Sequence, residues 1–159
     1  MNVQRILFLD FDGVINRMDE DGYYIGPEID RGLAERVGRM VNTLQVKVVV
    51  SSDWRNYHTL KQLQNKLWKY AGIVPQRVVG TTEPAYRKDG IRGQEIQDWL
   101  KGFVAPVRIA VLDDNHEGRF NMDGVRPWFV HTKHSEGVSD ANIEQATALA
   151  RRMVTRWGM

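Results

Sequence analysis

The sequence of 159 residues contains no cysteine. This absence excludes disulfide bonds, zinc sites with thiolate ligands and a cysteine nucleophile. No apolar run approaches the roughly 20 residues that a membrane-spanning helix needs. The short apolar stretch near the amino terminus is followed at once by acidic residues, without the small-residue cleavage site of a signal peptide. We therefore expect a cytoplasmic protein with no membrane partner.

The sequence also lacks internal repeats, low-complexity segments and a strong overall charge. Lys and Arg number 22 against 20 Asp and Glu, so the net charge of +2 says little about partners. Neither G-x-G-x-x-G nor a P-loop motif is present, which argues against those two modes of nucleotide binding. A chain near 150 residues buries about 68–70% of its unfolded surface, so it can form a stable hydrophobic core without disulfide bonds or structural metals. We expect a single domain over residues 1–159.

Five short apolar or β-branched runs are typical of strands buried on both faces of a parallel sheet. They lie at Ile6–Leu9, Val46–Val50, Arg77–Val79, Val107–Leu112 and Trp128–Val130. Segments with helical periodicity lie at 33–44, 60–70, 93–101 and 143–157, with Gly72 expected to end the second helix and Ser139 to cap the last. This order predicts an α/β three-layer domain with a mainly parallel, five-stranded sheet.

Ligands of such sheets bind outside the carboxyl ends of the strands, where the first run is followed by Asp10-Phe11-Asp12-Gly13. Two carboxylates after a buried strand are costly unless they are paired or bound to a metal. Asp10 could act as a nucleophile that forms an aspartyl-phosphate, and Asp12 could protonate the leaving oxygen and then activate water. The alternative is a pair of carboxylates that cap a loop.

Polar side chains also follow two other runs. Ser51 and Ser52 come after the second run, where a hydroxyl beside free amides could bind phosphate oxygens, although a simple helix cap is the alternative. Asp113 and Asp114 come after the fourth run, where two acids could bind Mg²⁺, although an acidic surface turn is the alternative. Carboxylates thus follow the first and fourth runs, and hydroxyls follow the second. Together they favour a site that binds phosphate and a metal ion.

This ordered set resembles the haloacid dehalogenase-like (HAD) phosphohydrolase superfamily over nearly the whole chain. The segments S-S-D-W-R, R-G-x-E-I-x-x-W-L and G-V-S-D-A-N-I-E-Q-A resemble the HAD branch found in RNA-repair "Swiss Army knife" proteins. The resemblance implies a Rossmann-like HAD fold, Mg²⁺ as the cofactor and a phosphate ester as the substrate. It also implies that the chain is an enzyme, a phosphatase of the HAD type.

The resemblance also implies roles for individual residues. Asp10 would be the nucleophile and a Mg²⁺ ligand, and Asp12 would be the general acid and base with its backbone carbonyl on the metal. Ser51 would hold a phosphoryl oxygen. Asp114 would be the direct carboxylate ligand of the metal, and Asp113 would orient a water in the metal's shell.

The family's third motif is a lysine or arginine near a helix start, and two residues here are candidates. Arg92 lies directly before the predicted helix and matches the position best, whereas Lys88 is the second choice. Ser52, Trp54 and Arg55 follow the second strand and, with Lys88, are expected to contact substrate. Trp54 could line the pocket or stack on a base, although core or edge packing is the favoured interpretation.

Residues 13–30 leave room for a hairpin flap but not for a cap domain, so the site should be open. Within 55–92, eight basic residues stand against two acidic ones. Such an excess could track a polyanion, and we expect a terminal phosphate of RNA or DNA as the substrate. The alternatives are free nucleotides or other small phosphate esters, a non-catalytic phosphate-binding module and a Mg²⁺-dependent nuclease, the last disfavoured by the D-x-D-G motif. The oligomeric state stays open.

Several aromatic residues outside these motifs have simpler interpretations. Trp68, Trp99 and Trp157 lie on helix faces and are expected in the core. His131 and His134 flank the end of the fifth strand, where two histidines without a third ligand favour a surface loop over a metal site.

Overall fold

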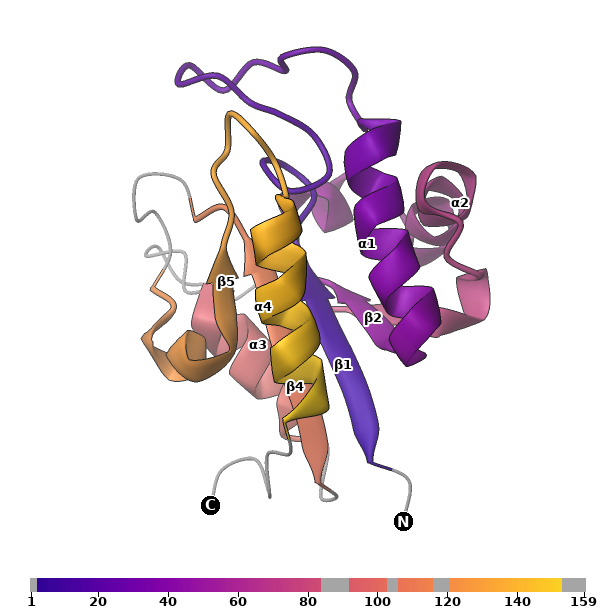
Figure 1. Cartoon of the computed structure of the whole chain (residues 1–159), viewed down its shortest axis with the longest axis vertical. Helices are drawn as coiled ribbons and strands as arrows, with labels where there is room; N and C mark the ends of the chain where they lie inside the picture. The colour runs from indigo at the N-terminus through magenta and orange to yellow at the C-terminus, as the bar shows by residue number, and fades with distance from the viewer. Residues whose placement is uncertain (1–2, 84–91, 103–105, 116–120, 153–159) are drawn as a thin grey trace.

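The computed structural model describes residues 3–83, 92–102, 106–115 and 121–152. One five-stranded sheet, with the order β3-β2-β1-β4-β5, runs through them, and all four strand pairs are parallel (Figure 1). Its strands are β1 (Gln4–Leu9), β2 (Lys47–Val50), β3 (Val78–Thr81), β4 (Val107–Asp113) and β5 (Phe129–His131). The predicted α/β fold with a parallel sheet is therefore confirmed.

Helices cover both faces of this sheet and form the three expected layers. Helices α1 (Arg31–Leu44), α2 (Leu60–Ala71) and α4 (Asp140–Arg151) pack on one face. Helix α3 (Arg92–Leu100) and the 3₁₀ helix η4 (Asp123–Trp128) pack on the other. Because side chains alternate along a strand, Leu7 and Leu9 enter the first core whereas Ile6 and Phe8 enter the second.

The helix ends follow local sequence chemistry. Gly72 ends α2 in the left-handed conformation, with φ +69°, and Ser139 caps α4 through a capping box with Asn142, as predicted. The predicted strand at 77–79 instead covers residues 78–81, because Pro75 opens a 3₁₀ turn, η2 (Pro75–Arg77), that includes Arg77. Helix α3 begins at Arg92, one residue earlier than predicted.

The prediction that Trp68 is buried is wrong. Helix α2 buries Leu63, Leu67 and Ala71, and Trp68 follows that stripe by one position, so 54% of it is exposed. Trp99 is partly buried and packs edge-on against Phe8, with ring centroids 5.6 Å apart. Trp157 lies outside the described residues.

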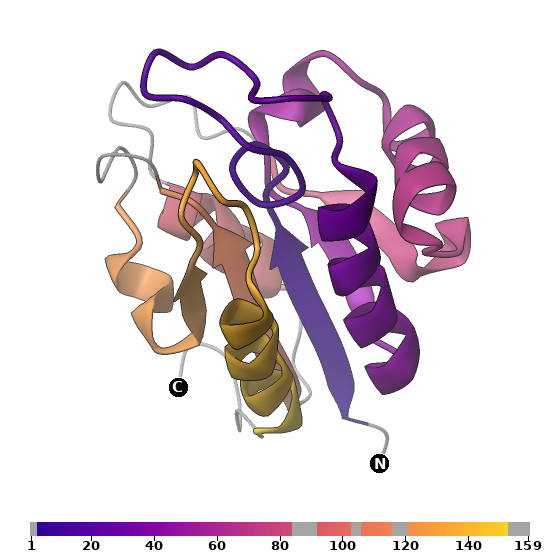
Figure 2. The ribbon, with the colours of Figure 1, turned by 45° about the horizontal axis from the view of Figure 1, so that its top comes forward.

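The sheet has its topological switch point between β1 and β4. The chain runs outward from β1 to β2 and β3, and then returns to the other side of β1 as β4 and β5. Both strands end beneath the indigo segment that follows β1 and arches across that end of the molecule (Figure 2). The switch point therefore lies where the sequence predicts the site. No helix among the described residues is long and apolar enough to cross a membrane.

Candidate active site

Three predicted carboxylates meet at the switch point. Asp10 directly follows β1, Asp113 is the last residue of β4, and Asp114 comes next. One carboxylate oxygen from each lies within 4.8 Å of the other two. Asp10 and Asp113 are only 4% and 1% exposed. Pairing between β1 and β4 continues past the strand end, since the Asp10 N–H donates to the Leu112 carbonyl at 3.0 Å, which fixes this convergence.

Arg92, the first residue of α3, completes the buried part of the site. Its Nη1 lies 3.9 Å from Asp10 Oδ1, and its Nε lies 3.6 Å from Asp113 Oδ2. It also donates to the Ser51 carbonyl and lies 3.4 Å from Asp53 Oδ1. Because its side chain is 2% exposed, this is a buried charge with matched partners. We call Asp10, Ser51, Arg92, Asp113 and Asp114 the floor cluster.

The electrostatics of the floor cluster favour a bound cation. Burial raises the pKa of Asp10 well above its usual value, and the nearby Asp113 raises it further, against a lowering by Arg92. Burial likewise raises the pKa of Asp113, although Arg92 and the Asn115 N–H, 2.7 Å from Oδ1, oppose it. Burial disfavours the charge of Arg92, but the carboxylates outweigh it and raise its pKa. One guanidinium does not balance three carboxylates.

Gly13 brings the loop after β1 against the loop after β4. Its φ is +76°, and a Cβ there would lie 2.3 Å from Asp114 Oδ2, closer than atoms can approach. The Thr132 hydroxyl donates to the Gly13 carbonyl at 2.7 Å. Glycine is therefore required both for the backbone turn and for the position of the Asp114 carboxylate.

The two serines after β2 have different roles. Ser52 caps the 3₁₀ helix η1 (Asp53–Asn56), and its Oγ accepts from the Trp54 N–H at 3.3 Å, which is the helix-cap interpretation. Ser51 is 1% exposed, and within the part of the chain that the structure describes its Oγ has no hydrogen-bond partner. A buried hydroxyl without a partner is costly. Ser51 Oγ therefore remains available to a ligand oxygen.

Asp12 lies outside the floor cluster, in a second group of side chains. Its Oδ1 accepts hydrogen bonds from Asn16 Nδ2 and from Trp54 Nε1, each at 2.9 Å. Burial, the charge of Asp12 and a hydrogen bond to its carboxylate are among the causes that raise the pKa of the Tyr24 hydroxyl to about 12. We call Asp12, Asn16, Tyr24 and Trp54 the rim cluster.

Two of the residues expected to contact substrate, Trp54 and Arg55, already have partners within the protein. Trp54 is 6% exposed, with its ring 5.1 Å from Phe11 and stacked on His58, so it is not free to stack on a base. Arg55 Nη2 lies 2.5 Å from Glu95 Oε2, in a buried ion pair, so its charge is already compensated. Lys88 lies outside the described residues.

The interpretation of His131 and His134 as loop residues is compatible with the geometry. His131 Nε2 contacts the Asp114 carbonyl oxygen. Among the described residues, the metal-ligand group that the geometry identifies contains Asp10, Asp113 and Asp114 and neither histidine.

Sequence reasoning missed three residues that shape the site. Asn16 is fully buried, and its Oδ1 accepts from the Gly13 N–H at 2.8 Å, so it fixes the turn that carries Asp12. In the sequence, Asn16 could have been recognised as a polar amide within the apolar stretch that follows D-F-D-G. Glu95 could have been recognised as an acidic residue one helical turn after Arg92. Tyr24 offered no such signal, because its contact depends on the path of residues 17–30.

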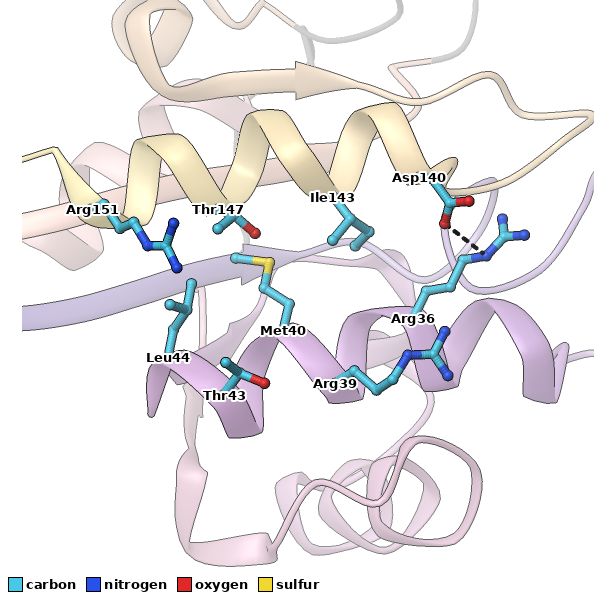
Figure 3. A pocket seen from close by; sticks show the side chains of 9 residues that line it. All are labelled: Arg36, Arg39, Met40, Thr43, Leu44, Asp140, Ile143, Thr147 and Arg151. Carbon is cyan, nitrogen blue, oxygen red and sulfur yellow. Dashed lines mark ion pairs between the residues drawn. The ribbon is translucent and has the colours of Figure 1, made fainter.

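A separate pocket of about 230 Å³ lies between α1 and α4 (Figure 3). Arg36, Arg39 and Arg151 line it, and Arg36 Nε lies 3.6 Å from Asp140 Oδ1. None of the floor or rim residues lines this pocket. Its helical walls lie on one face of the sheet, so it is distinct from the carboxylate site at the strand ends.

Comparisons with known proteins agree with this geometry. A family described as the HAD domain in Swiss Army Knife RNA repair proteins matches residues 6–143, which include every described residue of both clusters. A search among curated proteins finds no match. The matched family implies a phosphatase-type hydrolase that acts on a phosphate ester, usually with a metal. With most of its length matched and its parallel sheet in place, the chain belongs to the HAD domains of Swiss Army Knife RNA repair proteins.

Proposed function

We propose that the chain is a Mg²⁺-dependent phosphomonoesterase that works through an aspartyl-phosphate on Asp10. The observation that carries this proposal is the floor cluster. There a buried carboxylate, a buried arginine and a serine hydroxyl that has no partner among the described residues converge at the topological switch point. Membership of a HAD family supports the same reaction class.

The two carboxylates of D-F-D-G would divide the chemistry. An Asp10 oxygen would bond to phosphorus while the bond from phosphorus to the leaving oxygen breaks, and Asp12 would give its proton to that oxygen. Asp12 would then take a proton from the water whose oxygen attacks the aspartyl-phosphate, which releases inorganic phosphate and restores Asp10. Ser51 Oγ would donate to a phosphoryl oxygen, and Arg92 would offset charge on Asp10 and the phosphoryl group.

The donor set fits Mg²⁺. The group offers carboxylate oxygens from Asp10, Asp113 and Asp114, which suit a hard cation, and the Asp12 carbonyl would add another oxygen. The raised pKa values of Asp10 and Asp113 support a bound cation, because burial disfavours their negative charge. Bound Mg²⁺ would offset the charge that develops on the phosphoryl oxygens.

Hydrolysis of p-nitrophenyl phosphate with Mg²⁺ and with EDTA tests the reaction class, and acid quenching followed by peptide mass spectrometry tests the intermediate. We expect Mg²⁺-dependent turnover and one phosphoryl group on the peptide that contains Asp10. Asp98→Asn, an exposed carboxylate on α3, is the matched control for Asp10→Asn. Binding of phosphate esters without phosphate release from any substrate would instead support a non-catalytic binding module.

For the substrate, we propose a terminal phosphate on a polynucleotide rather than a free nucleotide or another small ester. The description of the matched family, which names RNA repair, supports RNA ends. Helix α2 supports a polyanion, because its twelve residues include three lysines and no acid. Lys66 Nζ lies 5.7 Å from the Trp54 ring, which connects this helix to the rim cluster.

For such a substrate we propose the exposed basic residues of 55–92 rather than all of them. Arg55 and Arg92 are engaged in buried ion pairs, so they are not part of an open basic track. Lys61 and Lys69 are exposed, and the exposed Trp68 lies between them on the same helix. Trp68 therefore replaces Trp54 as the aromatic side chain that could stack on a base.

A phosphorylated oligonucleotide and the matching mononucleotide distinguish these substrates. We expect a higher kcat/KM for the oligonucleotide at low salt, with an advantage that shrinks as salt rises. Charge reversal of Lys61 and Lys69 should remove most of the advantage, and reversal of Lys66 should add to the effect. The control is reversal of Lys101 and Arg152, which follow the far ends of α3 and α4. Equal efficiency on both substrates at low salt would contradict the polynucleotide proposal but not the phosphatase proposal.

A further inference from the structure

The Asp12 carboxylate has one oxygen that is fully used by the protein. Oδ1 accepts the amide N–H of Asn16 and the indole N–H of Trp54, each at 2.9 Å. A carboxylate oxygen accepts about two hydrogen bonds through its lone pairs. Both acceptor positions of Oδ1 are therefore occupied by N–H donors, so this oxygen is not available to carry a proton. The other oxygen, Oδ2, remains for exchange of a proton.

Trp54 is held so that its N–H keeps this direction. Its ring lies 5.1 Å from the Phe11 ring on one side, and it stacks on His58 at 4.9 Å with an interplanar angle of 17°. Its backbone N–H donates to Ser52 Oγ, within the 3₁₀ turn. Because ring and backbone are both fixed, the indole is a rigid donor to Asp12.

We propose that Trp54 is a positioning residue for Asp12. Its indole N–H holds Oδ1 as an acceptor, so that Oδ2 gives the proton to the leaving oxygen and later takes one from water. This assignment rests on the proposed function and adds to it one residue that touches Asp12 rather than the reacting atoms. Asn16 shares the contact but also fixes the turn at Gly13, so its removal would not test the idea cleanly.

The leaving group makes this role measurable. A poor leaving group, such as the alcohol of an alkyl phosphate, needs a proton as its bond to phosphorus breaks, whereas dinitrophenolate does not. A misplaced Asp12 should therefore slow alkyl phosphates and spare dinitrophenyl phosphate. The ratio kcat/KM is the appropriate quantity, since it reports the steps through departure of the leaving group and not later hydrolysis of the phosphoenzyme.

The experiment measures kcat/KM for Trp54→Phe across phosphate esters of graded leaving-group pKa. By analogy with residues that orient metal ligands, we expect losses of roughly 10- to 100-fold on alkyl phosphates, and less than about 2-fold on dinitrophenyl phosphate. If Trp54→Phe does not fold, the indole N–H resonance of Trp54 in Asp12→Asn, described below, tests the contact instead. The matched control is Trp99→Phe, which packs on the opposite core.

Asp12→Asn provides the reference for interpreting these variants. If Asp12→Asn shows the leaving-group dependence and Trp54→Phe shows either no loss or the same loss on every ester, the positioning proposal is overturned and the proposed function stands. If Asp12→Asn itself loses activity equally on every ester, Asp12 is not the general acid and both proposals fail. The indole N–H resonance of Trp54 gives a readout besides activity: it should shift upfield in Asp12→Asn, as the hydrogen bond weakens.

Discussion

The floor and rim clusters contain aspartates two positions apart in the sequence, yet their surroundings are opposite. Asp10 is buried beside two other carboxylates and one guanidinium. Asp12 is held by the neutral N–H donors of Asn16 and Trp54. The comparison teaches that two residues of the same type differ through their environment, which is why we propose metal binding for Asp10 and proton exchange for Asp12.

Replacing Asp10 should break the comparison most strongly. Asp10→Asn removes the nucleophile, so we expect at least a 10³-fold loss of turnover, about 4 kcal/mol of barrier, with the fold retained. The loss should be the same for every leaving group, in contrast to that of Asp12→Asn. Steady-state kinetics on aryl and alkyl phosphates measure both patterns. Turnover by Asp10→Asn close to that of the wild type would rule out the aspartyl-phosphate.

Replacing Arg92 tests whether the floor cluster depends on its single buried cation. Arg92→Gln leaves Asp10 and Asp113 without their partner, which for a buried pair costs about 3–5 kcal/mol of stability. Arg92→Lys keeps the charge and should retain part of both stability and activity. Urea unfolding and aryl phosphate hydrolysis measure the two effects.

Lys101→Gln is the control for Arg92, since its ion pair with Asp98 is exposed and should contribute less than about 1 kcal/mol. An Arg92→Gln protein as stable as the control would show that the floor cluster needs no cation from the protein.

The metal prediction separates two carboxylates within the floor cluster. Mg²⁺ should raise the melting temperature of the wild type, because an ion that binds only the folded state stabilises it. Asp114→Asn should raise the Mg²⁺ concentration needed for this shift and for activity more than Asp113→Asn does. Ca²⁺ should inhibit, since its looser coordination suits in-line transfer poorly. Equal responses of the two variants would contradict the assignment of Asp114 as the direct ligand.

A smaller effect concerns the pH dependence of stability without metal. Burial raises the pKa of Asp10 and Asp113, so the folded protein keeps protons that the unfolded chain has lost. Stability should therefore decrease as pH rises from about 4, the unfolded value, through the folded pKa. In EDTA, the melting temperature of the wild type should fall as pH rises above about 4, and it should fall more than that of Asp10→Asn.

Asp123→Asn, an exposed carboxylate, is the control and should behave as the wild type does. A wild type and an Asp10→Asn protein with the same pH dependence would show that the floor cluster is not under electrostatic strain.

The sequence predicted the floor cluster better than the rim cluster, for a physical reason. Asp10, Ser51 and Asp113 lie at strand ends, and a parallel sheet brings strand ends together whatever the loops do. The rim cluster depends on where the indole of Trp54 points and on the path that takes Tyr24 back to Asp12. Neither follows from periodicity or from motif spacing.

Two errors in helix α2 and its surroundings have similar causes. Leu67 belongs to the buried stripe of α2, and Trp68 is the next residue. Because a helix turns by about 100° per residue, Trp68 points away from the stripe toward solvent. Arg55 was counted in a basic surface run, but its partner Glu95 lies forty positions away on α3. Long-range pairs of this kind are decided by tertiary structure and not by local sequence.

The central position of β1 has a consequence for the order of assembly. β1 is the first strand of the chain, but it pairs with β4, and the contact between Thr132 and Gly13 spans 119 positions. Closing so long a loop makes the native contacts late and folding slow. Until β4 is available, β1 has an unpaired edge and two apolar faces, which favours self-association. A chain cut between β3 and β4 should therefore aggregate rather than form half a site.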